Sequence, residues 1–329
     1  MLDENHYSSR IILRKVTSKS ILCKTESLVG VPRPESRPKK PPEPSRGRRC
    51  LPLNDPHRSL SIVIAPGRRP ILEAISLTKR YASIPAVQEV SFRLQAGQVL
   101  GCLGPNGSGK STTVKMLTGL LDPTRGQVLF HGEDIRKDLV GYRKRLGYVP
   151  EEPSPYPYLT GREYLEMVGT LRAMPVSELS QKVDALLDLF ALYSNRHSSI
   201  ASYSKGMRQR ILLIAALMDN PEILIFDEPL SGLDVTSALI LKNLIKTLGQ
   251  QGRAIFYCSH VLEVVEQVCS HLLILRKGNV IACDTTSAIQ NNIEHSTLER
   301  TFMHLVEDVD AEKITRDIVS VMSMTMNAA

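Results

Sequence analysis

Short apolar runs recur along this chain and predict the strands of a buried sheet. Residues 99–103, 223–226 and 254–258 are each four or five mostly apolar positions between polar or glycine residues. That pattern is typical of a strand buried on both faces. Residues 71–94 alternate loosely between apolar and polar and end at the turn 95–97. This alternation predicts short antiparallel strands before the first apolar run.

Other apolar positions recur at the spacing of a helix face. Residues 205–219 predict one helix, which ends before Pro221. Three further apolar faces are formed by Val114, Leu117 and Leu121, by Leu165, Val168 and Leu171, and by Leu179, Val183, Leu186 and Leu187. The last two faces lie in the stretch 160–190, so we expect a helical insert near 155–203.

The remaining runs complete the outline of the fold. Residues 126–130 predict another strand, and residues 272–275 with 280–283 predict a hairpin. Strands interleaved with helices indicate an α/β fold with a largely parallel, helix-covered sheet. The length of 329 residues allows one large domain or two ordinary ones.

Positive charge is concentrated at the N-terminus. Residues 1–69 hold 15 Lys and Arg against 6 Asp and Glu, whereas the other 260 residues hold 26 against 28. The core therefore lacks the basic face of a nucleic-acid-binding domain, and we expect no nucleic-acid partner. Residues 1–69 also hold 9 of the 20 prolines, which predicts a disordered, dispensable extension. The other interpretations are an arm for anionic lipid or nucleic acid, a targeting segment, or a start codon assigned too far upstream.

The sequence lacks two features, a long apolar run and paired cysteines. No run of 18 or more apolar residues occurs, so no segment is expected to span a membrane. The six cysteines are scattered and include no C-x-x-C pair. This favours free thiols in a reducing cytoplasm over disulfides or a metal site.

Candidate chemistry first appears after the strand at 99–103, where the chain fits the phosphate-binding pattern G-x-x-x-x-G-K-[ST]. The loop consists of Gly104, Pro105, Asn106, Gly107, Ser108, Gly109, Lys110, Ser111 and Thr112. Its backbone N–H groups and the following helix N-terminus attract phosphate oxygens. Lys110 is expected to reach the β- and γ-phosphates and Ser111 to bind Mg²⁺. The alternative is an ordinary glycine-rich turn.

A second candidate site, which is acidic, lies 117 residues past Lys110, where the run 223–226 ends in Asp227 and Glu228. A buried strand would hold Asp227 rigidly near a Mg²⁺ water shell. Glu228 would then orient or deprotonate the attacking water. The alternative is a strand that ends in solvated acids.

Together these motifs resemble the nucleotide-binding subunit of an ATP-binding cassette (ABC) transporter over roughly residues 71–290. The resemblance implies a P-loop NTPase fold, with a RecA-like core, an antiparallel β subdomain and an inserted α-helical subdomain at about 155–203. It assigns residues 70–294 to the nucleotide-binding domain. Residues 295–329 follow as a helical tail, in which Leu298, Phe302 and Leu305 have helical spacing.

The resemblance extends to further residues. Tyr81 matches the aromatic that stacks on adenine, although a core aromatic would also fit. Asp234 belongs to the loop 231–234 that crosses a dimer interface, and His260 matches the histidine that senses the γ-phosphate. The signature usually written LSGGQ corresponds to a tyrosine followed by Ser204, Lys205, Gly206 and Met207. Ser204 and Gly206 would meet the γ-phosphate; a plain helix N-cap is the alternative role for Ser204.

Position 151 and the signature both depart from the family pattern. Glu151 stands where glutamine is usual, and an ionised carboxylate only accepts hydrogen bonds. Glu151 remains a candidate ligand of Mg²⁺ or water, with solvated loop acid as the alternative. Lys205 and Met207 replace a glycine and a glutamine of the signature. This variant resembles the signature of bacterial ABC-2 type exporters.

The resemblance implies an ATPase that uses ATP and Mg²⁺ and dimerises with a second copy around two ATP molecules. It would power a separate integral membrane permease, and would lie peripherally on the cytoplasmic face of the membrane. The alternative is a soluble ABC ATPase acting on ribosomes or DNA; a single phosphate loop and the lack of sustained heptads disfavour it. Intact Lys110, Asp227 and Glu228 disfavour a scaffold without turnover.

Overall fold

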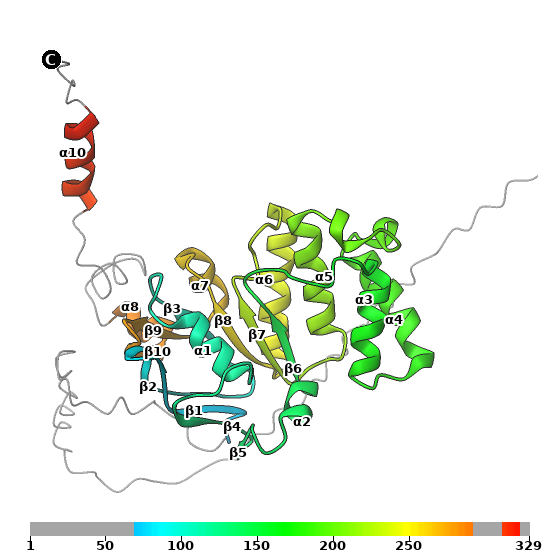
Figure 1. Cartoon of the computed structure of the whole chain (residues 1–329), viewed down its shortest axis with the longest axis horizontal. Coiled ribbons are helices and arrows are strands. Elements are labelled where there is room, and N and C mark those ends of the chain that lie inside the picture. Colours follow the sequence, from blue (N-terminus) through cyan, green and yellow to red (C-terminus); the bar gives the residue numbers. More distant parts are fainter. Residues whose placement is uncertain (1–68, 292–310, 323–329) are drawn as a thin grey trace, which may run out of the picture. The chain divides into compact units, whose positions relative to one another are not determined.

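The computed structural model describes residues 69–291 and 311–322 (Figure 1). The expected extension at 1–69 therefore lies outside the described residues, except for Arg69. Leu298, Phe302 and Leu305 of the expected tail also lie outside them. Within the tail, α10 (Ala311–Met322) is described as a helix.

The central sheet has six strands in the order β10-β9-β3-β8-β7-β6 (Figure 1). These are β3 (Val99–Leu103), β6 (Leu146–Val149), β7 (Ile223–Asp227), β8 (Ala254–Cys258), β9 (His271–Arg276) and β10 (Asn279–Thr285). All neighbouring pairs are parallel except β9 and β10, which form the expected hairpin. The carboxyl ends of β3, β6, β7 and β8 consequently meet at one edge, where ligands bind in such sheets.

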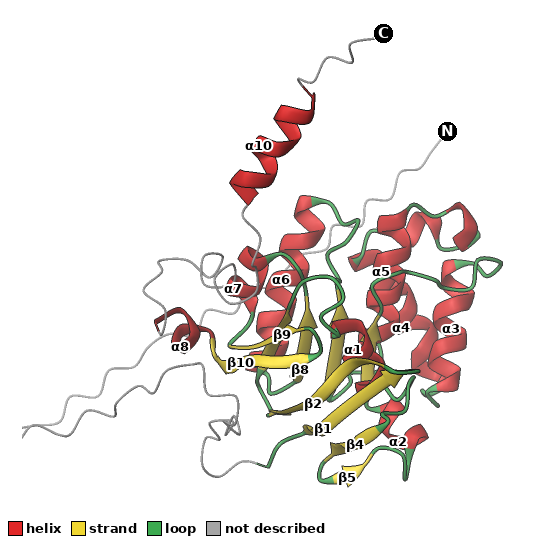
Figure 2. Ribbon diagram, turned by 60° about the vertical axis from the view of Figure 1, so that its left-hand side comes forward, coloured by secondary structure: helices red, strands yellow, loops and turns green. Residues whose placement is uncertain are grey.

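A second sheet has four antiparallel strands in the order β2-β1-β4-β5 (Figure 2). Its strands are β1 (Leu72–Tyr81), β2 (Ile84–Leu94), β4 (Arg125–Phe130) and β5 (Glu133–Asp134). The pairing of β1 with β2 confirms the antiparallel strands expected before β3. It also brings the end of β1 near the start of β2, at the turn between Tyr81 and Ile84.

Both faces of the central sheet are covered, which explains its continuous apolar strands. In β8, Phe256 faces one core with α1 (Lys110–Leu117) and the antiparallel sheet, and stacks on Phe92 at 5.3 Å between ring centroids. Its neighbours Ile255 and Tyr257 face the opposite core. That second core is closed by α5 (Lys205–Leu217), α6 (Val235–Gln250) and α7 (Leu262–Val268). The described part also contains α2 (Leu139–Lys144) and α8 (Thr286–Asn291).

The helical insert forms a third core of its own. Helices α3 (Gly161–Leu171) and α4 (Val176–Leu189) contact each other and α5. Short 3-10 turns follow at Tyr193–Asn195 and Ile200–Ser202. The shared interior includes Leu165, Leu179, Val183, Leu187, Ile211 and Ile214. At the end of α3, Arg172 donates to the Leu146 carbonyl of β6 at 3.1 Å, which joins the insert to the central sheet.

Two apolar positions were wrongly assigned by their spacing. Leu121 lies beyond α1, because the helix ends at Leu117 and Gly119 follows with a left-handed φ of 66°. Leu171 is the last residue of α3 and is 74% exposed. At 3.6 residues per turn, six positions place it about 120° around the helix from Leu165, on another face. Helical periodicity alone does not locate where a helix ends.

Two further observations concern cysteines and membrane segments. Cys102, Cys258, Cys269 and Cys283 are free thiols, as expected, and the other two cysteines lie outside the described residues. Among the described residues, no helix combines the length and apolar character needed to cross a bilayer.

Thr160 begins the insert with a capping box. Its Oγ1 accepts from the Glu163 backbone N–H at 3.2 Å, and the Glu163 carboxylate accepts from the Thr160 N–H at 2.8 Å. We expect Thr160→Ala to lower the free energy of unfolding by about 1 kcal/mol, because a helix N–H loses its acceptor. Thr170→Ala, later in α3, is the matched control and should change it by less than about 0.5 kcal/mol. Urea denaturation followed by circular dichroism measures both; equal effects would contradict the capping role.

Candidate functional site

The phosphate loop connects β3 to α1 through backbone that only glycine adopts easily. Gly109, the residue before α1, has φ 104°, and a Cβ there would lie 2.7 Å from the Ala86 carbonyl oxygen. A Cβ on Gly104 would lie 2.3 Å from Ser108 Oγ. The loop is therefore tightly wound, and the first N–H groups of α1 remain without side-chain caps. Uncapped N–H groups at a helix N-terminus can bind an anion.

Lys110 folds back over this loop. Its Nζ donates to the carbonyl oxygens of Gly104 at 2.6 Å and Pro105 at 3.1 Å. The ammonium group is thus held above the loop by neutral acceptors. Ser108 is 1% exposed and its Oγ has no hydrogen-bond partner within the described structure.

Asp227 ends β7 beside the loop. It is 5% exposed and pairs in register with Cys258 of β8. Burial first, and then the neighbouring Glu151 and Glu228 carboxylates, raise the pKa of Asp227 to about 6, although Lys110 acts in the opposite direction. A buried carboxylate near two others is electrostatically unfavourable without a cation.

Glu228 follows with a left-handed backbone, at φ 49°. Its side chain is 12% exposed and is held by three donors of the loop after β8. Oε1 accepts from the His260 backbone N–H at 2.8 Å and lies 2.7 Å from His260 Nδ1; Oε2 accepts from Ser259 Oγ at 3.2 Å. This arrangement fixes the carboxylate, while the His260 side chain remains 72% exposed.

These groups surround one pocket of about 240 Å³. It is lined by Ala86, Asn106, Gly107, Gly109, Lys110, Ser111, Thr112, Glu151, Asp227, Glu228 and His260. The structure thus brings together residues from five places in the sequence, at the carboxyl edge of the parallel strands. Sequence reasoning missed Ala86, whose position depends on how β2 lies against the loop and carries no local signal.

Other candidate residues do not line this pocket. Tyr81 is 50% exposed at the end of β1, with Lys79 Nζ 5.9 Å from its ring centroid. Ser204 caps α5, since its Oγ accepts from the Met207 N–H at 3.2 Å. Asp234 caps α6 through the Ser237 N–H at 2.9 Å. The signature, Ser204 to Met207, therefore lies outside the pocket of its own chain.

The donor set of the pocket fits a hard divalent cation. Carboxylate and hydroxyl oxygens are the ligands that Mg²⁺ takes in nucleotide sites. Ser111, Asp227 and Glu151 could supply them. Burial, and then the Glu151 and Glu228 carboxylates, raise the pKa of Asp227, and a bound cation would favour its ionised form.

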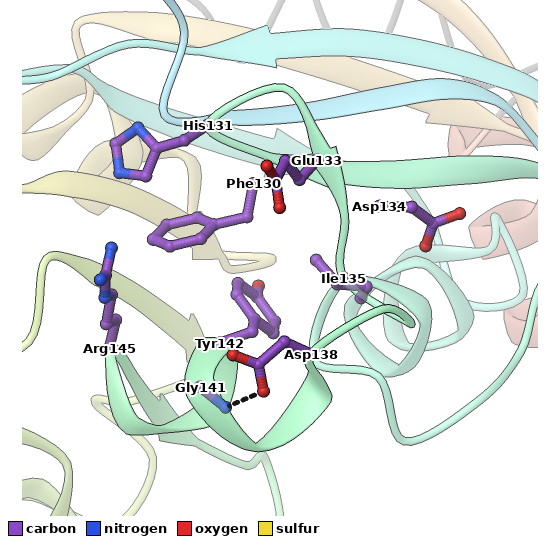
Figure 3. A pocket seen from close by; sticks show the side chains of 9 residues that line it. All are labelled: Phe130, His131, Glu133, Asp134, Ile135, Asp138, Gly141, Tyr142 and Arg145. Atoms are coloured by element: carbon purple, nitrogen blue, oxygen red, sulfur yellow. Dashed lines mark hydrogen bonds between the residues drawn. The ribbon is translucent and has the colours of Figure 1, made fainter.

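A second cavity of about 260 Å³ lies at the turn after β4 and shares no lining residue with the first (Figure 3). Asp138 on its wall caps α2 through the Gly141 N–H at 2.8 Å, drawn as a dashed line. Asp134 is bound to Arg136 at 2.5 Å, and His131 to Glu222 at 2.6 Å. Because these polar groups already have partners, we assign no ligand to this cavity.

Comparison with known proteins agrees with this geometry. The family model described as "ABC transporter" matches residues 87–231. The uncharacterised ABC transporter ATP-binding protein YxlF of Bacillus subtilis is 37% identical over 210 residues, which cover 64% of this chain and 69% of that protein. EcsA, an ABC-type transporter ATP-binding protein of the same bacterium, is 30% identical over 240 residues, which cover 72% of this chain and 97% of EcsA.

The chain belongs to the ABC transporter ATP-binding proteins. A third relative, the linearmycin resistance ATP-binding protein LnrL of Bacillus subtilis, is 34% identical over 228 residues, covering 69% of this chain and 73% of LnrL. Among solved structures, an ATP-binding subunit of an ABC transporter superposes with a TM-score of 0.68 at 30% identity, over 71% of this chain and 99% of that one.

Membership confirms the expected fold. The ABC ATP-binding protein described here has a P-loop cassette with a RecA-like parallel core, an antiparallel β sheet and an inserted helical subdomain. It is an ATPase that converts ATP and water to ADP and phosphate, and this hydrolysis is coupled to transport. An ATPase of this family binds nucleotide within the cassette.

Proposed function

We propose that this ATPase hydrolyses Mg²⁺-ATP in the 240 Å³ pocket and drives an exporter. The observation that supports this most directly is the meeting of Lys110, Asp227, Glu228 and His260 in one pocket, although 150 residues separate the first from the last. Separately, each residue has an ordinary structural explanation. On this proposal, they supply in the same order a cation, a metal ligand, a general base and a group that senses the γ-phosphate.

On this proposal, backbone N–H groups of the phosphate loop and Lys110 hold the β- and γ-phosphates. Ser111 and Asp227, with Glu151 beside them, hold the Mg²⁺ ion, which neutralises charge on the phosphates. Glu228 orients the attacking water and accepts its proton. His260, bonded to the same carboxylate, keeps Glu228 in place and lies near the γ-phosphate.

Ser204 and Lys205 of the signature are exposed in a single subunit, and we propose that a second copy completes each site. Ser204 and Gly206 of one copy would then face the γ-phosphate held by the other, with Asp234 in the loop between them. Tyr81, at the end of β1, would stack on the adenine. The cassette MJ0796, which shares this fold at 24% identity and a TM-score of 0.60, is described as a dimer bound to ADP and phosphate in a post-hydrolysis state.

The proposed partner of the dimer is an integral membrane permease, with the subunit lying on the cytoplasmic face of the membrane. Several apolar side chains of the insert and of the segment before it are exposed: Tyr156, Tyr158, Leu171, Val176 and Leu189. A contiguous exposed apolar patch marks a contact surface, and we propose that these side chains form one that meets the permease. The ABC-2 type signature and the likeness to the resistance protein LnrL favour export as the direction.

Coexpression tests the permease proposal. The chain is coexpressed with candidate polytopic membrane proteins of the same genome, and any detergent-extracted complex is purified. We expect Tyr158→Ala, at a side chain that is 93% exposed, to reduce the copurified permease by about tenfold, because an interface aromatic contributes about 1–2 kcal/mol.

Val140→Ala is the matched control, since Val140 is 70% exposed on α2, outside the insert. This variant should copurify as the parent does. If neither variant changed the yield, the segment before α3 would not contact the permease. Outward movement of a labelled substrate in proteoliposomes, dependent on ATP, then tests the direction; inward movement would contradict export.

A further inference from the structure

Lys205, the unusual residue of the signature, is the first residue of α5 and is exposed. Its Nζ donates to Ser231 Oγ at 2.9 Å, in the loop between β7 and α6. The stem of the side chain lies against Gly232, where a Cβ would be 3.1 Å from Lys205 Cγ. The lysine therefore ties the signature to this loop.

The first two turns of α5 carry three cations whose hydrogen-bond acceptors are neutral, although the charge of Asp234 lies near Arg210. Arg208 donates to the Tyr203 carbonyl at 2.6 Å, and Arg210 donates to the Phe190 carbonyl at 3.0 Å. Among the described residues, none of Lys205, Arg208 and Arg210 forms an ion pair with a carboxylate. The first turn of α5 also contains no acidic residue.

This arrangement is electrostatically unfavourable in an isolated subunit. A helix N-terminus has a positive partial charge, and a lysine in its first turn adds to that charge instead of compensating it. A strong anion in front of α5 would be attracted by the helix N-terminus and by the Lys205 ammonium. The nucleotide in the same chain cannot be this anion, because no signature residue lines that pocket.

Lys205 also has free donor capacity. An ammonium group has three N–H donors, and one of them is used by Ser231. Gly206 fixes the geometry further, because a Cβ on it would lie 2.5 Å from the Gly232 carbonyl. The signature and the loop 231–234 therefore form one closely packed surface, with Ser204 and Lys205 exposed on it.

We propose that Lys205 donates to the γ-phosphate of the ATP held by a second copy of this chain, and that Ser231 is the positioning residue that orients it. The inference rests on the proposed dimer and adds a side-chain cation to it, at a position where the family usually has glycine. Because ADP lacks the γ-phosphate, the contact favours the dimer with ATP over the dimer with ADP.

The test uses the full chain with Glu228→Gln, so that ATP is not consumed. Light scattering follows dimer formation against ATP concentration, and a fluorescent ATP analogue measures nucleotide affinity of the dilute monomer. We expect Lys205→Gln to require about tenfold more ATP for half-maximal dimer, the low end for a hydrogen bond to a charged group. Monomer affinity should not change, because Lys205 is outside its own pocket. Lys205→Arg should restore dimer formation.

Lys246→Gln is the matched control, since this exposed lysine of α6 lies outside the signature and its loop, and it should behave as the parent does. Ser231→Ala should weaken dimer formation less than Lys205→Gln. When Ser231→Ala is combined with Lys205→Gln, it should not weaken dimer formation further, because Ser231 acts through the lysine. Additive effects, or an unchanged ATP requirement for Lys205→Gln, would overturn the inference. A parent that stays monomeric at saturating ATP would instead overturn the proposed dimer, and this contact with it.

Discussion

Replacing Glu228 by glutamine is expected to lower ATP turnover by about a thousandfold, because the general base is lost. ATP binding should be retained, since the phosphate loop and Lys110 are unchanged. The amide keeps the length of the side chain and still accepts from the His260 N–H, now at 2.8 Å from Glu228 Oε1. The structure of the pocket should therefore survive, while the proton of the attacking water has no acceptor.

Release of phosphate under saturating Mg²⁺-ATP measures this effect, and nucleotide affinity is measured in parallel. Glu152→Gln is the control, since Glu152 is an exposed acid one residue past Glu151 and does not line the pocket. It should hydrolyse ATP within about twofold of the parent, as expected for a surface substitution. Turnover in Glu228→Gln equal to that of the parent would eliminate Glu228 as the base.

Asp227→Asn is expected to abolish Mg²⁺-dependent turnover and, without nucleotide, to stabilise the fold. The pKa of Asp227 rises from 3.8 to about 6 on folding, chiefly because of burial. The folded chain thus binds this proton more tightly than the unfolded chain. Its free energy of unfolding consequently falls as the pH rises between these two values, and remains lowered above about pH 6. At 1.36 kcal/mol per pKa unit, the full effect is about 3 kcal/mol.

The neutral amide avoids this cost, so Asp227→Asn should gain up to about 3 kcal/mol over the parent at pH 8 and about half as much at pH 5. Urea unfolding of the nucleotide-free protein at both pH values provides the measurement. Asp188→Asn, at an exposed acid of α4, should shift the free energy by less than about 0.5 kcal/mol. A gain for Asp227→Asn that is the same at both pH values would mean that ionisation of Asp227 is not its cause.

The sequence predicts what depends on local spacing. Strands at 99–103 and 254–258 have the bounds expected from their apolar runs, because each is buried on both faces and ends where polarity returns. The phosphate loop is recognisable because neighbouring atoms leave no room for a side chain at its glycine positions. The acidic end of β7 is recognisable by another signal, because the strand before it is continuously apolar.

Contacts between distant segments were not predictable in this way. Ala86 reaches the pocket through the position of β2, and Lys205 meets Ser231 although 26 residues separate them. Leu121 fits a helical pattern but follows the left-handed Gly119. Each depends on where elements end or on how they lie together, and hydrophobic spacing encodes neither. The roles of Tyr81, Ser204 and Asp234 likewise remain predictions, because they concern a nucleotide and a second copy.

The left-handed backbone of Glu228 limits which residues this position can accommodate. Asparagine and aspartate adopt φ near 50° more readily than other non-glycine residues. Their side chains are one methylene shorter, so they would retract from the His260 N–H that Glu228 reaches at 2.8 Å. β-branched residues would combine backbone strain with the loss of the carboxylate. Low backbone strain and a side chain long enough to reach the His260 N–H thus favour different residues at this position. The glutamate in this chain has the required length and accepts the strain.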